Sequence, residues 1–522
     1  MTARTLARAG LVVTTAFLIS RVLGWLRIAV ISVTFGATTD LDAFFAAFRI
    51  PDLMFQLVAA GALGSALVPV VAGLLATDEE RRAWRLVSSL ANLMLIALLV
   101  LSVAFFVAAP VAVPLITPGF DETATARTVE LTRVMLLSPI LLALGSVATS
   151  ALNAAGRFGA SAVAPIAYNT AIILGAVVLG PVIGVTGLAI GVVGGSLLHL
   201  LVQLPPLRSA GFRYQPLAEL GDPDTRRTLR LLGPRTLGLA SSQLTFIVAT
   251  TLASGAGVGA ITAFTIAFTV LQIPIGVIGV PLGIVLLPSL SREVAVGGTR
   301  EFANLVSRSL RLLVFVMLPI TALGMALRSQ VVTLLFDYGR FDERAVRLTS
   351  DTLLPFLVGL AAHAAIAVLA RAFYARQDTV TPVAAAVLAV IVNTALAIVL
   401  VGPLGVPGIA LAIAVGAWVE AGVLLGLLDR RVDGLEVGGL ARVIIATGVA
   451  AAAAGVAGAA IVGALDTTLG AEPSKILVLA QAIAATAVGG LLFVGLAVAL
   501  RIPELPTIVS VMADLVRRRG RG

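Results

Sequence analysis

The sequence predicts an all-α polytopic membrane protein with fourteen transmembrane helices, and composition and hydropathy pattern are the evidence. Of its 522 residues, 59% are hydrophobic and only 12% are charged, which excludes a soluble globular protein. Runs of about 18 or more apolar residues recur along the whole chain, and each is long enough to cross a bilayer as a helix. Cysteine is absent and only two histidines occur, so no metal site is expected.

The apolar runs define the fourteen predicted spans in order. The first run follows a basic N-terminus, and no small-residue cleavage site comes after it, so we expect a retained helix rather than a signal peptide. The predicted spans are residues 12–36, 43–75, 86–116, 132–154, 160–181, 184–205, 231–254, 259–290, 308–334, 351–373, 380–402, 405–428, 440–464 and 475–500.

The distribution of basic residues predicts the orientation of these spans. Of the 36 lysines and arginines, we assign 25 to the N-terminus, the C-terminal tail and the loops after even-numbered spans. At most seven follow odd-numbered spans. Because cytoplasmic loops carry the excess of basic residues, both termini are predicted to be cytoplasmic. The four arginines left for the spans are Arg21, Arg27, Arg49 and Arg235.

An internal repeat predicts two lobes of six helices each. The segment "SALVPVVAGLL" resembles "IVLLPSLSREV", and "ALNAAGRFGAS" resembles "ARAFYARQDTV". Both pairs, which align Pro69 with Pro288 and Arg157 with Arg376, are separated by the same 219 residues. Six helices is an even number, so the two lobes have the same orientation and are related by an axis along the membrane normal. The predicted parts are an N-lobe (1–205), a cytoplasmic linker (206–230), a C-lobe (231–428), and two further helices with a basic cytoplasmic tail (429–522).

The first span carries two arginines, Arg21 and Arg27, which we place close to one face of one helix. An arginine near the bilayer centre costs at least ~2.5–3.5 kcal/mol on insertion scales, so their presence needs an explanation. One interpretation is that Arg21 snorkels to an interface. The other is that both arginines face a water-filled cavity and bind an anion.

The second span adds further charged residues. Asp40 is expected in a solvated outer loop, while for Asp42 helix capping and a role in a cavity are both open. Arg49 and Asp52 lie deeper, and Pro51 between them predicts a break in the helix. Exposed backbone inside a bilayer is tolerated only against protein or water. Arginines on adjacent helices beside a broken helix therefore favour a cavity, and guanidinium groups bind phosphate bidentately, which predicts a pyrophosphate cargo.

The second half of the chain is less charged. Residues 271–293 hold three prolines and a GxxxG motif, which predict a kinked and closely packed helix with Gln272 as its strongest polar group. Glu420 is the only acid within its predicted span, and both a protonatable coupling residue and a neutral packed carboxyl remain open. No phosphate-binding Gly-Lys loop or catalytic triad spacing is present, so we expect a transporter rather than an enzyme.

The motifs "SRVLGWLR", "DAFFAAFRIPDL", "GALGSALVPV", "LGIVLLPSLSRE" and "FYARQDTVTPV" resemble the MurJ (MviN) family of lipid II flippases. This family belongs to the multidrug/oligosaccharidyl-lipid/polysaccharide exporter superfamily, and the resemblance runs in order from about residue 10 to at least residue 430. It implies alternating access, a cationic central cavity and a bacterial cytoplasmic membrane. The implied substrate is the undecaprenyl-pyrophosphate-linked peptidoglycan precursor, lipid II.

Carried over residue by residue, the resemblance matches the two essential arginines of the family with Arg21 and Arg27, and its helix-2 aspartate with Asp42. Arg49 replaces a lysine. The chain departs from the family at four positions where a charged residue is usual, namely Ile28, Phe55, Ala60 and Thr269. The predicted substrate site is Arg21, Arg27, Asp42, Arg49, Asp52, Thr269 and Gln272.

The leading function is therefore a lipid II flippase. A flippase for another polyprenyl-linked oligosaccharide, a drug antiporter of the same superfamily and a non-transporting scaffold for cell-wall synthesis remain open as alternatives. No cofactor is expected, and both the membrane potential and a monovalent cation remain open as the driving force. The expected partners are the lipid-linked precursor, membrane lipids and cell-wall synthesis proteins, and nucleic acid is not among them.

Overall fold

The computed structural model describes residues 3–58, 62–469, 474–508 and 510, and all regular secondary structure within these ranges is helical. The helices of the first half are α1 (Ala3–Phe35), α2 (Thr39–Ala47), α3 (Arg49–Val58), α4 (Ala62–Ala76), α5 (Glu80–Ile116), α6 (Glu122–Met135), α7 (Leu137–Ala154), α8 (Phe158–Leu174), η1 (Gly175–Leu179), α9 (Gly180–Ile183), α10 (Val185–Leu201), α11 (Leu204–Ser209) and α12 (Pro223–Ser254). Those of the second half are α13 (Ala260–Pro274), η2 (Ile275–Gly279), α14 (Val280–Ala295), α15 (Thr299–Ala326), α16 (Arg328–Phe336), α17 (Glu343–Val358), α18 (Leu360–Ala375), α19 (Val380–Leu404), α20 (Val406–Arg431), α21 (Val437–Leu469) and α22 (Lys475–Ala499).

These helices coincide with the predicted membrane spans. Among the described residues, eleven helical segments are long and apolar enough to cross a membrane alone, and α17 with α18 forms a twelfth, bent by 45°. The other two predicted spans, residues 43–75 and 231–254, are helical where described but contain only shorter apolar helices, Ala66–Ala76 and Gln243–Ser254. The all-α membrane fold is therefore confirmed, while the count of fourteen stays a prediction.

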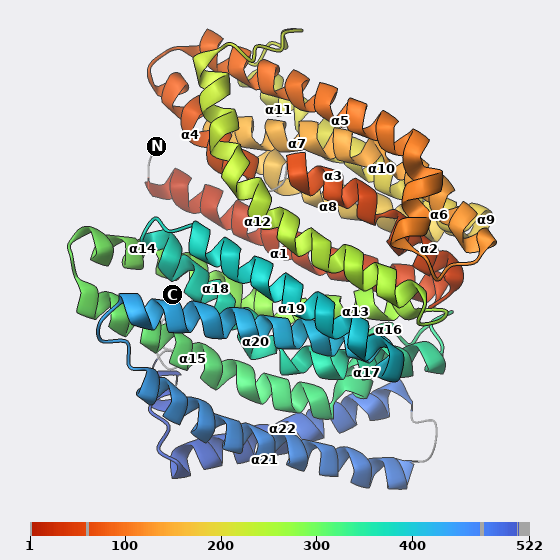
Figure 1. Ribbon diagram of the computed structural model, residues 1–522, viewed down its shortest axis with the longest axis vertical. Helices are drawn as coiled ribbons and strands as arrows, with labels where there is room; N and C mark the ends of the chain where they lie inside the picture. Colours follow the sequence, from red (N-terminus) through yellow and green to blue (C-terminus); the bar gives the residue numbers. More distant parts are fainter. Residues whose placement is uncertain (1–2, 59–61, 470–473, 509, 511–522) are drawn as a thin grey trace. The chain divides into compact units, whose positions relative to one another are not determined.

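The chain divides into two compact units (Figure 1). Unit 1 comprises Met1–Thr262 with Tyr338–Asp342, and unit 2 comprises Ala263–Asp337 with Glu343–Gly522. In unit 1, α8 packs between α1 and α10, and α12 packs against α3, α4 and α5. In unit 2, α20 packs against α17, α18 and α19, while α21 and α22 pack against each other and against α15. The unit boundary thus lies beyond the predicted N-lobe end at residue 205, because α12 packs with the helices before it.

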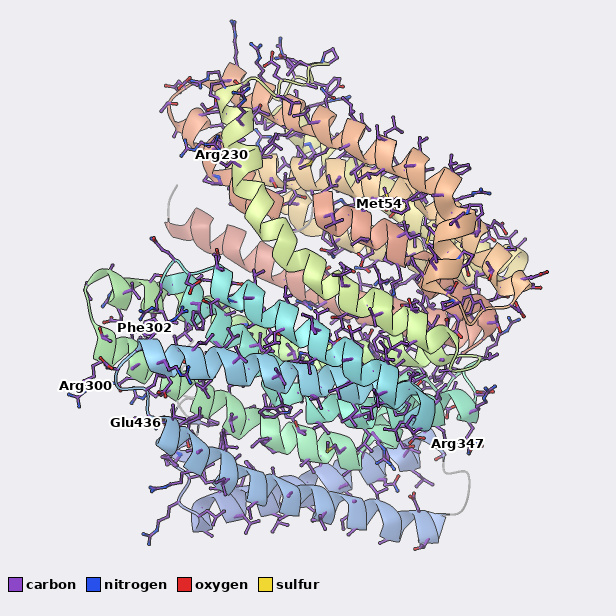
Figure 2. The ribbon with its side chains drawn as sticks, in the orientation of Figure 1. Met54, Arg230, Arg300, Phe302, Arg347 and Glu436 are labelled. Carbon is purple, nitrogen blue, oxygen red and sulfur yellow. The ribbon has the colours of Figure 1, made fainter. Side chains whose placement is uncertain are left out.

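Figure 2 shows where charged side chains lie along the helices of unit 2. Arg300, in a loop predicted to be cytoplasmic, lies at one end of the unit, and Arg347, in a loop predicted to be external, lies at the other (Figure 2). Glu436 lies at the same end as Arg300, and its carboxylate accepts a hydrogen bond of 3.0 Å from Arg311. These three charged residues therefore lie at the ends of the helical unit, as expected when the length between them is apolar.

The predicted helix break at Pro51 is observed. Helix α2 ends at Ala47 and α3 begins at Arg49. Ala47 lies four residues before Pro51, and its carbonyl is the one that the missing proline N–H would have bonded. The Thr132 hydroxyl lies 3.5 Å from that oxygen and donates its hydrogen bond of 2.7 Å to the Thr128 carbonyl. The break therefore exposes a backbone acceptor to side chains of the unit, and it turns Arg49 and Asp52 onto a separate helix.

The predicted close packing in residues 271–293 is observed, and a π-helical turn interrupts the α-helix there. Helix α13 ends at Pro274 and passes through the π-helical turn η2 into α14. A Cβ at Gly279 would lie 3.3 Å from the Ala364 Cβ, and a Cβ at Gly283 would lie 2.9 Å from the Ala367 carbonyl oxygen. The GxxxG pair thus lets α14 and α18 approach closely, as small residues do between membrane helices.

One helix junction occurs in nearly identical form in each unit, which supports the internal repeat. Gly184 precedes α10 with φ 63° and ψ −147°, and Gly405 precedes α20 with φ 62° and ψ −141°. This conformation is open to glycine and strained for other residues. Three residues later, Gly187 and Gly408 each donate a backbone hydrogen bond back to that first glycine, at 3.0 and 3.1 Å.

The segment Tyr338–Asp342 belongs to unit 1 because it is bound to the end of α1. The Arg340 N–H donates a hydrogen bond of 2.9 Å to the Val33 carbonyl oxygen. Gly36 and Gly339 both have positive φ, and a Cβ on either would clash with the backbone oxygen of the other segment, at Arg340 and Val33 respectively. Two glycines are therefore required for this contact.

Candidate functional site

Unit 1 holds an arginine and an aspartate on the first two turns of α3, directly after the helix break. The Arg49 Nε donates a hydrogen bond of 2.8 Å to Thr250 Oγ1 on α12, and its guanidinium lies 5.3 Å from the centre of the Phe246 ring. Asp52, three residues on, interacts electrostatically with Arg49, and its carboxylate accepts hydrogen bonds from the side chains of Gln243 and Gln56. Helix α12 thus supplies the polar face against which this charged pair packs.

Arg27 reaches the same neighbourhood from α1. Its guanidinium carbon lies 5.9 Å from the centre of the Tyr168 ring on α8, and its Nε is buried without a hydrogen-bond partner among the described residues. The Tyr168 hydroxyl interacts electrostatically with both Arg27 and Asp52. Tyr168 therefore connects the arginine of α1 with the charged pair of α3 in one cluster, which we call the Tyr168 cluster (Arg27, Arg49, Asp52 and Tyr168).

Arg21 occupies a different environment from Arg27. Arg21 is exposed, whereas Arg27 is half-buried. Six residues separate them, so their side chains point about 120° apart around the helix axis. The two side chains therefore do not share a face of α1, and the prediction that they lie close to one face is wrong. Arg21 also lies about 9 Å from Arg27 along the helix axis, given a rise of 1.5 Å per residue.

Asp42 is buried, with only 2% of its surface exposed, and its carboxylate accepts three hydrogen bonds. The donors are the Gly259 N–H at 2.6 Å, the Thr262 N–H at 2.8 Å and the Thr262 hydroxyl at 2.7 Å. Asp42 thus satisfies the free backbone donors at the start of α13, while Thr38 caps its own helix. Asp40, two residues earlier, is exposed as predicted, but it lies in the first turn of α2 rather than in a loop.

The remaining predicted site residues do not belong to the Tyr168 cluster's unit. Thr269 and Gln272 lie on the part of α13 that belongs to unit 2. The Thr269 hydroxyl donates a hydrogen bond of 2.7 Å to the Thr265 carbonyl, and Gln272 is exposed. Among the positions that depart from the family pattern, Phe55 is half-buried beside an apolar cluster of unit 1, and Ala60 lies outside the described residues.

Three polar residues of the neighbourhood are absent from the predicted site. Tyr168 is one of only four tyrosines in the chain and lies in an apolar segment, a signal that could have identified it. Gln243 and Thr250 recur seven residues apart on α12, which places them on one face of that helix. A further residue, Arg371, lies within α18 and packs against Gly283, although the charge count assigned it to a cytoplasmic loop.

The Tyr168 cluster is suited to binding an anion. It combines two guanidinium groups with one carboxylate, so one positive charge is left over for a ligand. The Arg27 Nε has no partner within the described structure, and a buried donor without a partner costs free energy until a ligand accepts from it. Phosphate oxygens are the acceptors that the planar guanidinium group matches best.

Comparison with known proteins decides the family. A family model described as "Lipid II flippase MurJ" matches residues 31–479 of the chain. The chain belongs to the MurJ family. Among similar proteins, the lipid II flippase MurJ of Burkholderia cenocepacia is 32% identical over 436 residues, covering 82% of this chain and 84% of the relative. The probable lipid II flippase MurJ of Vibrio cholerae is 30% identical over 471 residues, covering 88% of each chain.

Solved structures agree with the MurJ assignment at the level of the fold. A lipid II flippase MurJ in an inward closed conformation has a TM-score of 0.77 at 20% identity, covering 94% of this chain and 99% of that structure. An inward-facing multidrug resistance MATE family transporter of the MOP superfamily has a TM-score of 0.67 at 17% identity, covering 81% and 99%. The predicted MurJ family and its superfamily fold are therefore confirmed.

Proposed function

We propose that this chain is a flippase that carries lipid II, the undecaprenyl-pyrophosphate-linked peptidoglycan precursor, from the inner to the outer leaflet by alternating access. Its membership of the MurJ family supports this function, because the relatives it matches carry the name of lipid II flippases. The observation on this chain that supports it most directly is the Tyr168 cluster, in which Arg27 keeps a buried donor without a protein partner.

The chemistry of the cluster fits a pyrophosphate group. Two linked phosphates carry several negative charges, and they need more than one positive donor within a short distance. Arg27 and Arg49 approach the cluster from two different helices, and Asp52 balances part of their charge while the site is empty. We infer that the pyrophosphate displaces water from Arg27 and gains an interaction with Arg49. Arg21 lies about 9 Å along α1 from Arg27 and on another face of the helix, so its part in the site stays a prediction from the sequence.

The proposed transport cycle requires no cofactor bound to the protein. The driving force is the membrane potential or a monovalent cation, and an ionophore that collapses only one of them separates the two. The partner in the reaction is the lipid-linked precursor itself. Cell-wall synthesis proteins that make and consume this precursor are the proposed protein partners.

Complementation tests the proposed function directly. A bacterium depleted of its own lipid II flippase should resume growth when it expresses this chain, and lipid II should again be accessible at its outer leaflet. A chain that accumulates in the membrane without restoring surface lipid II would contradict the proposal. If it instead restored the export of a different polyprenyl-linked oligosaccharide, the substrate would be that oligosaccharide.

We also propose that both chain termini face the cytoplasm of a bacterial cell, in its inner membrane. The chain has no cysteine, so single cysteines introduced in loops report the side on which each loop lies. Glu80→Cys, Leu220→Cys and Arg300→Cys should be shielded from an impermeant thiol reagent in intact cells, whereas Glu122→Cys and Glu343→Cys should react. All five should react after permeabilisation, and the opposite pattern in intact cells would reverse the orientation.

A further inference from the structure

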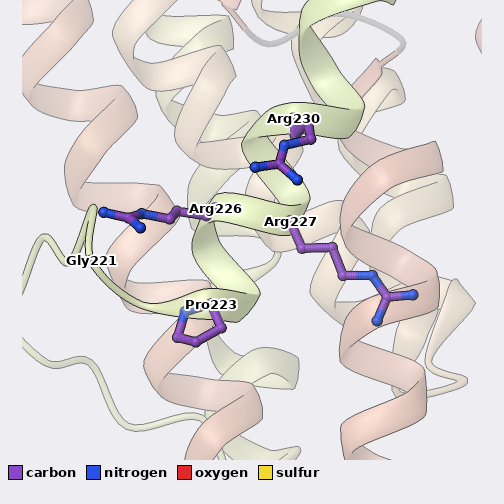
Figure 3. Close-up of a pocket in the computed structure, with 5 residues that line it drawn as sticks. All are labelled: Gly221, Pro223, Arg226, Arg227 and Arg230. Atoms are coloured by element: carbon purple, nitrogen blue, oxygen red, sulfur yellow. The ribbon is translucent and has the colours of Figure 1, made fainter.

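A pocket lined by arginines lies outside the Tyr168 cluster, where the inter-lobe linker enters α12. Its volume is about 320 Å³, and it is lined by Gly221, Pro223, Arg226, Arg227 and Arg230. Figure 3 shows Arg226 reaching over the loop at Gly221, Arg230 one turn further along the helix, and Arg227 extending away from Gly221. Arg226 and Arg230 are four residues apart and therefore share one face of α12. We call this site the linker pocket.

The loop that forms the linker pocket is held in place by polar residues of α5. Asn92 donates hydrogen bonds to the carbonyl oxygens of Gln215 at 2.9 Å and Leu217 at 2.8 Å. Its own side-chain oxygen accepts one of 2.7 Å from the Tyr214 hydroxyl, and Ser89 accepts one of 2.8 Å from the Glu219 N–H. The extended linker is thus fixed to a transmembrane helix, and the pocket has a defined shape.

The acidic residues around the linker pocket are already paired. Arg85 donates two hydrogen bonds to the Glu219 carboxylate, one of them 2.8 Å long, and Arg82 donates one of 2.7 Å to Asp224. The hydrogen bonds from Arg85 lower the pKa of Glu219 below its usual value, so this carboxylate stays ionised and bound to Arg85. Asp222 caps the start of α12 by accepting a hydrogen bond of 2.8 Å from the Thr225 N–H.

The arginines of the pocket, by contrast, have no acidic partner within the described part of the chain. Arg226 uses its Nε to donate a hydrogen bond of 2.9 Å to the Leu220 carbonyl, which fixes the side chain at the rim. Arg227 and Arg230 are exposed and form no ion pair with a carboxylate among the described residues. Three positive charges in the first turns of a helix also oppose its dipole, so an anion bound there would relieve an unfavourable arrangement.

We propose that the linker pocket binds the phosphate headgroup of an anionic phospholipid of the cytoplasmic leaflet. The last arginine of the pocket, Arg230, directly precedes the predicted span at residues 231–254, and lipid headgroups lie beside the ends of membrane helices. Arg226 and Arg230 bind the phosphate from one side of the helix, and Arg227 adds to the local positive charge. The cytoplasmic location rests on the orientation given under the proposed function.

Binding of a short-chain lipid to the full-length protein in detergent tests this site. Dihexanoyl phosphatidylglycerol should bind the wild type more tightly than dihexanoyl phosphatidylcholine, and Arg226→Gln/Arg230→Gln should weaken phosphatidylglycerol binding about 30-fold. This factor corresponds to ~2 kcal/mol, at about 1 kcal/mol for each arginine near a lipid headgroup. Arg208→Gln/Arg213→Gln, which removes two exposed charges from the same linker outside the pocket, is the matched control and should retain wild-type affinity.

The outcomes separate this site from the transport function. An equal loss in the control variant, or no loss in Arg226→Gln/Arg230→Gln, would refute the pocket. A matching 30-fold loss for undecaprenyl pyrophosphate, with phosphatidylglycerol unaffected, would assign the pocket to the transported substrate and refute the phospholipid. Arg230→Gln alone keeps the Leu220 hydrogen bond of Arg226 and serves if the double variant does not fold. Failure of complementation by the wild type would refute the transport function, and lipid binding would still be measured.

Discussion

Replacing Arg27 by alanine should abolish the appearance of lipid II at the outer leaflet, while the protein still inserts into the membrane and accumulates. Arg27 is the member of the Tyr168 cluster whose buried Nε lacks a partner among the described residues, so it offers a donor that the folded protein does not use itself. The substitution removes a bidentate contact with phosphate from the site and should change the stability of the folded protein little. The measurement is surface-accessible lipid II, normalised to the amount of protein in the membrane.

Two further variants make the Arg27 result specific. Arg27→Lys should restore little transport, because a point charge cannot reproduce the planar guanidinium contact with phosphate. Arg133→Ala is the matched control, since Arg133 is also half-buried over an aromatic ring in unit 1, 4.8 Å from the centre of Phe106. It lies outside the cluster, and its Nε donates a hydrogen bond of 3.1 Å to the Phe106 carbonyl. It should transport like the wild type. Normal transport by Arg27→Ala would mean that this arginine only snorkels or packs against Tyr168.

Replacing Asp42 by alanine should destabilise the protein and reduce transport as a consequence. The substitution leaves the Gly259 and Thr262 N–H groups at the start of α13 without their acceptor, and each buried donor left unpaired costs about 1–3 kcal/mol. We therefore expect a loss of stability on the order of 2–5 kcal/mol. The thermal unfolding midpoint of the purified protein in detergent is the measurement, alongside surface lipid II.

The neighbouring aspartate provides the control for this second prediction. Asp40→Ala removes an exposed carboxylate two residues earlier on the same helix and should change neither stability nor transport. Asp42→Asn keeps one acceptor oxygen and should fall between the wild type and Asp42→Ala. If Asp42→Ala unfolded at the wild-type temperature but did not transport, its carboxylate would act on the substrate, as the sequence resemblance implied, rather than on α13.

Some residues of the candidate site can be predicted from the sequence and others cannot. Arg27, Arg49 and Asp52 could be selected from the sequence because charges are costly in apolar spans. The structure places Arg27 and Asp52 near Tyr168, and Arg49 beside Asp52. The sequence gives a weaker indication for the uncharged residues Tyr168, Gln243 and Thr250, since uncharged polar residues in membrane helices commonly serve packing alone. Which polar residue faces a charge depends on helix rotation and on the neighbour that covers it.

The sequence by itself determined the fold class, the positions of the helices and the family of this protein. Long apolar runs leave a chain in lipid no alternative to the helix, and prolines such as Pro51 and Pro274 act through their own missing N–H groups, so both effects are local. Only the tertiary structure decided that Asp42 receives the first donors of α13 and that α12 packs with unit 1. These depend on contacts between residues far apart in the chain, 217 and 220 positions for the Asp42 hydrogen bonds, which no local pattern encodes.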